Sequence, residues 1–135
     1  MANAVYGKAR EKFLNGDIDW ANDDIKAVLV DTAAYAVSID SDEYLSSIPA
    51  GDRIATSGNL ASKTSTLGVA DAADITFSTV TGDVSEAIVL YKDTGDAATS
   101  PLIAYIDTAT GLPITPNGGD ITITWDSGAN KIFKL

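Results

Sequence analysis

Residues 86–106 read EAIVLYKDTGDAATSPLIAYI, and this stretch decides the fold class. Its two ends, 86–91 and 101–106, are apolar on both faces after Glu86, which is typical of strands buried on both faces. Between them lies a polar segment, 93–99, rich in the Asp, Thr and Gly residues that favour turns. The stretch therefore predicts a β-hairpin whose first strand is central in an antiparallel sheet.

Two further patterns predict strands of different kinds. Ile25–Val30 is apolar on both sides of the chain and predicts a second fully buried strand. Ile121, Ile123 and Trp125 instead alternate with polar residues, which is typical of a strand with only one face in the core. Trp125 should therefore be a core residue.

Shorter strands are expected wherever apolar or alternating residues lie between turn signals. These segments are 53–56, 60–67, 75–80 and 131–135. In the last of them, Phe133 and Leu135 should share one face. We therefore expect a mainly β fold, either an antiparallel β-sandwich or a barrel-like sheet, with the β region at about 24–135.

The N-terminal segment, about 3–14, predicts a short helix. Val5, Ala9 and Phe13 recur at i, i+4 and i+8, which is the spacing of an apolar helix face. Asn3 is a suitable N-cap for this helix.

The other end of this helix and a second helix are marked by capping residues. Gly16 follows Asn15 and provides a left-handed stop. One further short helix should begin at Asp40 or Ser41 and continue through Ile48, because Pro49 ends it.

Composition limits the functions that the chain can have. Its 135 residues are the size of one domain, so we expect a single domain over 1–135. The absence of cysteine and histidine excludes thiol catalysis, cysteine zinc sites and histidine general bases. Nine basic residues stand against nineteen acidic ones, and the net charge of −10 disfavours nucleic-acid binding. No apolar run is long enough for a signal-peptide core or a transmembrane helix. We expect a soluble, non-enzymatic protein without cofactor, metal, nucleic-acid or membrane partner.

Two acidic motifs have both a chemical and a structural interpretation. The aspartates at 17, 19, 23 and 24 are carboxylates of the kind that bind calcium, but their spacing is not that of an EF-hand. Residues 93–95, Asp-Thr-Gly, occur in aspartic proteases, which need a second such motif that this chain lacks. Capping of turns is the simpler interpretation of both motifs, with calcium binding at the first as the alternative.

A partner-binding surface is predicted at the N-terminal helix. Lys8, Arg10 and Lys12 supply three of the nine basic residues, and Tyr6 adjoins them. Trp20 follows in a turn-rich acidic segment, where it should be exposed and available to a partner. These five residues are the candidate interface, with no catalytic, cofactor or metal residue assigned.

Several stretches of the chain resemble a known family. They read KFLNGDIDW (12–20), DIKAVLVD (24–31), AIVLYKDTGD (87–96), SPLIAYID (100–107) and NGGDITITW (117–125). In these stretches the chain is similar to a group of small virion structural proteins of tailed bacteriophages, which includes head decoration (cement) proteins. The similarity covers most of the chain, is weakest at about 50–72, and includes no catalytic motif.

The resemblance implies a location and partners. A decoration protein is made in the host cytoplasm and then coats the outer surface of the phage head, where it clamps neighbouring major capsid protein subunits. An acidic protein suits this outer surface better than an interior filled with DNA. The resemblance also implies a homo-oligomer, with a trimer expected and a dimer as the alternative. Two other functions stay open: a tail or head–tail connector component, and a carbohydrate-binding module that stacks sugars on Trp20 and tyrosines.

Overall fold

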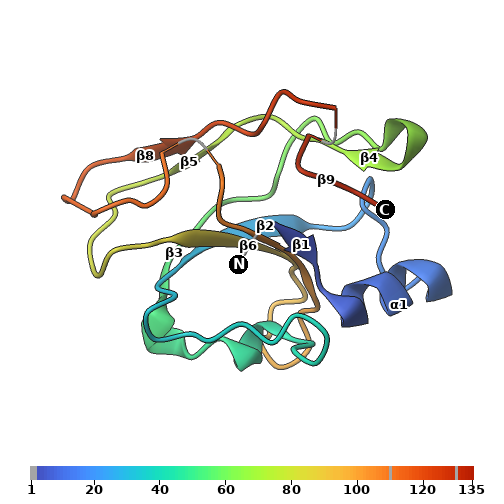
Figure 1. The fold of residues 1–135 in the computed structure, drawn as a ribbon, viewed down its shortest axis with the longest axis horizontal. Helices are drawn as coiled ribbons and strands as arrows, with labels where there is room; N and C mark the ends of the chain where they lie inside the picture. Colours follow the sequence, from blue (N-terminus) through green and yellow to red (C-terminus); the bar gives the residue numbers. More distant parts are fainter. Residues whose placement is uncertain (1–2, 110, 130) are drawn as a thin grey trace.

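The computed structural model describes residues 3–109, 111–129 and 131–135. Its largest element is a five-stranded antiparallel sheet with the strand order β1-β7-β6-β2-β3 (Figure 1). These strands are β1 (Ala4–Val5), β2 (Ile25–Val30), β3 (Arg53–Thr56), β6 (Ala87–Lys92) and β7 (Leu102–Ile106). The prediction of a mainly β fold is confirmed.

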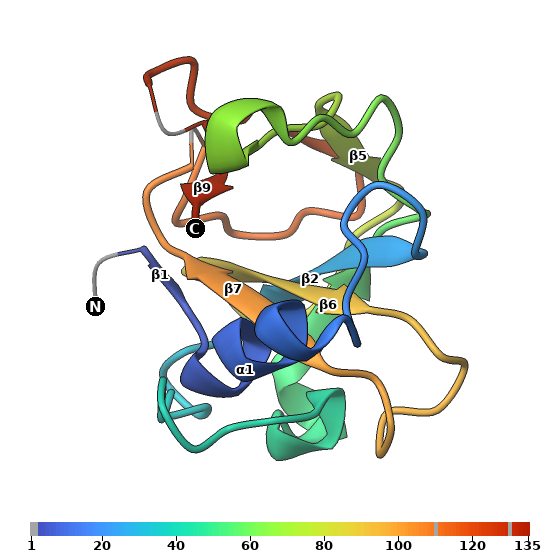
Figure 2. The ribbon, with the colours of Figure 1, turned by 90° about the vertical axis from the view of Figure 1, so that its right-hand side faces the viewer.

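Two small sheets form a second layer over one face of the large sheet (Figures 1 and 2). One pairs β4 (Val69–Ala70) with β9 (Phe133–Lys134), and the other pairs β5 (Ile75–Phe77) with β8 (Ile121–Ile123). Among the described residues, β1 and β3 are the open edges of the large sheet, which does not close into a barrel. The layered arrangement is therefore that of the sandwich alternative.

The opposite face of the large sheet is covered by helix α1 (Gly7–Asn15) and by the segment 31–52 (Figure 2). This segment contains two single 3-10 turns, and a third precedes β4. They are η1 (Leu45–Ser47), η2 (Ala50–Asp52) and η3 (Thr66–Gly68). No helix in the described ranges has the length and apolar character needed to cross a bilayer.

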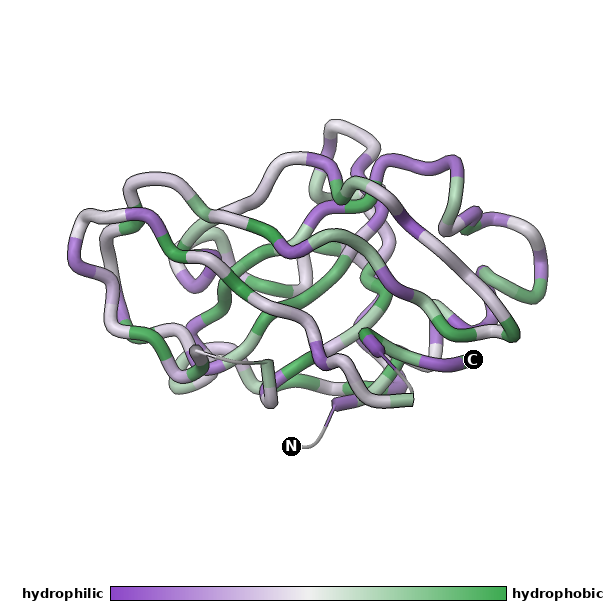
Figure 3. The backbone as a smooth tube through the Cα atoms, turned by 90° about the horizontal axis from the view of Figure 1, so that it is seen from above, coloured by the Kyte–Doolittle hydropathy of each residue, from purple (hydrophilic) through white to green (hydrophobic). Residues whose placement is uncertain are grey.

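The central strands are apolar without alternation because both faces of the sheet are covered. β2 and β6 pair along six residues, with Val28 opposite Val89, and both of these residues are completely buried. Every residue of β7 is buried as well. Hydrophobic residues accordingly concentrate along the inner strands and hydrophilic ones in the peripheral loops (Figure 3). The buried strand at 25–30 and the hairpin at 86–106 are both confirmed.

The N-terminal helix begins later than the apolar spacing predicts. Ala4 and Val5 pair with β7 as an edge strand, and the Asn3 Oδ1 accepts the Asp107 N–H at 2.8 Å instead of capping a helix. This pairing satisfies backbone groups of the sheet edge and buries Val5, so a helical conformation there is disfavoured. The end of the helix is as predicted, because Gly16 has φ +79° in the left-handed region.

Other expected elements are shorter than predicted. The second helix is reduced to η1, although Leu45 and Ile48 are buried as its apolar spacing implies. Residues 60–67 form no strand, since Ser62 and Leu67 have φ of 55° and 54°, values that interrupt extended backbone. β5 ends at Phe77 rather than continuing to residue 80.

For the C-terminal strands, the prediction that Trp125 is buried is confirmed, and the prediction that Phe133 and Leu135 share one face is not. Ile123 and Trp125 are buried, and the Trp125 indole N–H donates to the Ala73 carbonyl at 3.0 Å. Phe133 is buried as well, but Leu135 is 57% exposed, because β9 ends at residue 134 and the chain no longer continues its alternation. The expectation that Phe133 and Leu135 share a buried face is therefore wrong.

Candidate interaction surface

Tyr6, one of the five candidate interface residues, is completely buried at the N-terminus of α1. Its hydroxyl lies 3.0 Å from that of Tyr35, which donates to Asp42 Oδ2 at 2.6 Å. Burial raises the pKa of both tyrosines. Tyr6 therefore ties α1 to the segment that contains Tyr35 and Asp42. The prediction that Tyr6 is available to a partner is therefore wrong.

Trp20 is also a core residue rather than an exposed one. Only 6% of it is exposed, and its indole N–H donates to the Thr64 carbonyl at 2.9 Å. The ring packs edge-on against Phe133 with centroids 5.3 Å apart. The acidic neighbours of Trp20 face water while its ring turns inward, so the prediction of an exposed tryptophan is wrong.

Lys8 and Lys12 are engaged within the chain. Lys12 Nζ lies 3.0 Å from Glu43 Oε1 and 5.2 Å from the centre of the Tyr44 ring. Its hydrogen bond to Glu43 lowers the pKa of that carboxyl and raises the pKa of Lys12. Lys8 makes a longer contact, 3.4 Å, with Glu11. Two of the predicted cations are thus partly neutralised by their neighbours.

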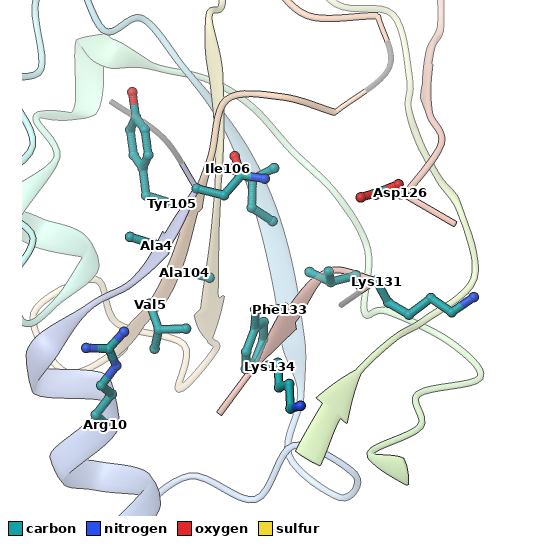
Figure 4. Close-up of a pocket in the computed structure, with 12 residues that line it drawn as sticks. Ala4, Val5, Arg10, Ala104, Tyr105, Ile106, Asp126, Lys131, Phe133 and Lys134 are labelled. Atoms are coloured by element: carbon teal, nitrogen blue, oxygen red, sulfur yellow. The ribbon is translucent and has the colours of Figure 1, made fainter. Parts of the chain in front are cut away.

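Arg10 remains a candidate, and the fold brings Lys134 to the same region. Both residues are exposed, and within the described ranges neither side chain has an ion pair or hydrogen bond. They line two clefts of about 300 and 410 Å³ between α1 and β9. Figure 4 shows Arg10 reaching from α1 and Lys134 from β9, with Phe133 beside Lys134 and Asp126 at the far end of the cleft.

Exposed leucines occur at the same end of the molecule as these two cations. Leu14 is 88% exposed and lines the second cleft together with Arg10, Lys134 and Leu135. Leu67, 91% exposed, belongs to η3, whose Gly68 carbonyl accepts the Leu135 N–H at 3.1 Å, so it lies near the end of β9. We call Leu14, Leu67 and Leu135 the leucine patch.

The patch continues into an apolar groove of about 380 Å³. Phe13, Trp20, Phe133 and Leu135 are among the residues that line it. Contiguous exposed apolar surface of this kind, with charged residues at its rim, is characteristic of sites that bind other proteins.

The two acidic motifs serve the turns that contain them. Asp19 accepts the Ala21 and Asn22 N–H groups at 3.2 and 3.3 Å, and its hydrogen bonds with Asn22 lower its pKa. Asp93 accepts the Gly95 N–H at 3.0 Å and pairs with Lys26 at 2.9 Å. Within the described ranges, no group of three or more carboxylates is placed to hold a metal ion.

One carboxyl group is held in an unfavourable environment. Glu86 Oε2 is buried without a hydrogen-bond partner among the described residues. Burial is the main reason that the pKa of Glu86 is raised, and the neighbouring charge of Asp31 adds to the effect.

The fold adds Leu14, Leu67, Lys134 and Leu135 to the candidate surface and removes Tyr6 and Trp20 from it. A signal for one of them was present, because Leu14 lies beside Phe13 and off the apolar stripe of the helix. Comparison with known proteins does not identify the surface: no protein-family model matches the chain, and no curated protein matches it.

Proposed function

We propose that the protein is a non-catalytic virion structural protein of a tailed bacteriophage. In this proposal it decorates the outside of the head and stabilises contacts between major capsid protein subunits. The observation that carries the proposal is the leucine patch with Arg10 and Lys134 at its rim, since a surface of this kind binds proteins. The resemblance of the sequence to virion structural proteins supplies the identity of the partner.

The charge distribution supports an outer location. The chain carries a net charge of −10, so a position against packaged DNA is electrostatically unfavourable. Arg10 and Lys134 are unpaired in the described part of this acidic chain, and they lie together where the apolar surface is exposed. A decoration protein needs only a standard interface on each copy, because the symmetry of the shell repeats the contact.

The carbohydrate-binding alternative loses its main support. Sugar-stacking sites need exposed aromatic faces, and Trp20 is only 6% exposed. Four of the five tyrosines are buried as well: Tyr6, Tyr35, Tyr91 and Tyr105. A decoration or connector role needs no such aromatic platform.

Labelling of intact virions tests the location. Particles made by the phage that encodes this chain are incubated with gold-labelled antibodies against it and imaged. Label spread over the heads is expected, whereas label at the tail or the head–tail junction supports the connector alternative. Absence of the protein from purified particles, measured by mass spectrometry, overturns the proposal.

Reconstitution tests the stabilising role. Particles from a phage lacking the gene should release DNA at a lower temperature than complete particles. Added purified protein should restore the release temperature, with a copy number close to that of the capsid sites. Heads that lose DNA at the same temperature with and without the protein would contradict a cement function.

A further inference from the structure

The exposed large hydrophobic side chains of the described residues occur at two places. Leu14, Leu67 and Leu135 form the leucine patch, and the fourth, Val84, is 42% exposed in the loop between β5 and β6. This loop lies at one end of the longest axis of the molecule, and α1 and β9 lie towards the other end (Figure 1). An exposed apolar side chain at one end and exposed leucines at the other are the layout needed for head-to-tail contact.

The Val84 loop is a firmly held projection. All four residues of the tip, 81–84, are exposed. On one side, Ser85 exchanges two backbone hydrogen bonds of 2.9 Å with Ile114. On the other side, Val80 is bonded through its N–H and carbonyl to the segment 118–119 at 3.0 and 2.7 Å. A projection fixed at both ends loses little conformational freedom when it docks.

The charges at the two ends are complementary. Asp83 stands beside Val84 at the tip and has no ion pair or hydrogen bond among the described residues. Arg10 and Lys134 at the leucine patch are unpaired in the same way. A patch-to-patch dimer would instead place these cations against their own copies, which is electrostatically unfavourable.

We propose that copies of this chain associate head to tail. The Val84 side chain of one copy inserts between the exposed leucines of the next, and Asp83 pairs with Lys134 and Arg10. Such a contact joins different surfaces, so it closes into a ring when the rotation per copy allows it. A trimer, the assembly that the resemblance to decoration proteins implies, is one such ring. Head-to-tail contact does not depend on where in a virion the protein sits, so it stands or falls separately from the proposed function.

Charge reversal on the isolated protein tests the contact. Sedimentation velocity over a range of concentrations should show reversible association of the parent chain. Lys134→Glu and Asp83→Lys should each weaken it by about tenfold or more, because each places like charges opposite one another. The double variant should recover much of the parent affinity. An equimolar mixture of the two single variants should recover association in pairs, although a three-membered ring built from both keeps one contact between like charges. Val84→Ser should weaken association without lowering the melting temperature.

Asp96→Lys is the matched control. Asp96 is exposed in the loop between β6 and β7, outside both the Val84 loop and the leucine patch, and its reversal changes the net charge as much as Asp83→Lys does. The control should change the association constant by no more than about twofold, because only its effect on the net charge of the chain should remain. A parent chain that stays monomeric at high concentration overturns the proposal. So does association that Lys134→Glu weakens and Asp83→Lys does not, since that result indicates a patch-to-patch dimer or another surface.

Discussion

The indole ring of Trp20 meets the Phe133 ring edge-on, with centroids 5.3 Å apart and planes at 83°. Phe13 of α1 approaches the same Phe133 ring at 6.2 Å. Aromatic pairs in such geometry add stability beyond the area they bury. Phe133 thus joins three segments that are distant in sequence: α1, the turn before β2, and β9. This aromatic cluster forms the floor of the apolar groove beside the leucine patch.

Both tryptophans should therefore be essential for stability. Each is 6% exposed, and truncation removes both ring burial and an indole hydrogen bond. We expect Trp20→Ala and Trp125→Ala each to lower the free energy of unfolding by about 3–5 kcal/mol. Chemical denaturation measures this loss, with Leu14→Ala as a control that should change it by less than about 0.5 kcal/mol. A Trp20→Ala variant as stable as the parent would place Trp20 on the surface, as its polar neighbours suggested.

The fold was predictable where a segment carries its own pattern. The strand segments at 25–30, 87–91 and 102–106 are apolar at every position but Lys26, as expected for strands covered on both faces. The start of α1 was not predictable, because Val5 pairs with Ala104, a partner about a hundred residues away. The local spacing of apolar residues favours a helix at Val5. Strand pairing with the edge of β7 is more favourable and keeps Val5 extended.

The candidate surface was only half predictable for the same reason. Arg10 was found because cations concentrate in one segment of an acidic chain. Trp20 was misplaced because the residue that covers it, Phe133, comes from the other end of the sequence. Lys134 carries no local signal, since its importance comes from its position beside Arg10 after folding.

The hydroxyl of Tyr35 should matter more to stability than that of Tyr6. Tyr35 both donates to Asp42 and lies beside the Tyr6 hydroxyl. Tyr35→Phe therefore leaves the Tyr6 hydroxyl without this partner and removes one of the two hydrogen bonds of Asp42 Oδ2, which still accepts the Ser38 N–H at 2.9 Å. We expect a loss of about 1–3 kcal/mol for Tyr35→Phe and about 1 kcal/mol for Tyr6→Phe. Urea denaturation of both variants measures the order. Equal losses would indicate that the two hydroxyls do not form a chain ending at Asp42.

The stop of α1 provides a test of backbone conformation alone. Gly16 has φ +79°, and a Cβ added there would meet no atom within 4 Å. Gly16→Ala should therefore cost about 1 kcal/mol through left-handed strain only, and Gly16→Asn should cost less. Gly51 has equally open space without a positive φ, so Gly51→Ala should be neutral or slightly stabilising. Thermal melting of the three variants checks this order, and equal effects of the two alanine substitutions would contradict it.

Ionisation of Glu86 should destabilise the fold. Its Oε2 is buried without a partner among the described residues, and burial and then the charge of Asp31 raise its pKa in the folded state. A carboxyl with a raised folded-state pKa contributes stability that is fully present below its unfolded pKa and is lost as pH rises through the folded value. Glu86→Gln removes the charge and offers an amide donor near Asp31.

The melting temperature of Glu86→Gln should therefore exceed that of the parent at about pH 7, and the difference should shrink towards about pH 4, where the parent side chain is also neutral. Scanning calorimetry at both pH values measures this. Glu11→Gln is the matched control, because Glu11 is exposed and its contact with Lys8 is a surface ion pair of little energetic weight. The control should change the melting temperature little at either pH. A gain for Glu86→Gln that is the same at both pH values would mean that shape or packing, rather than the charge of Glu86, limits the stability of this site.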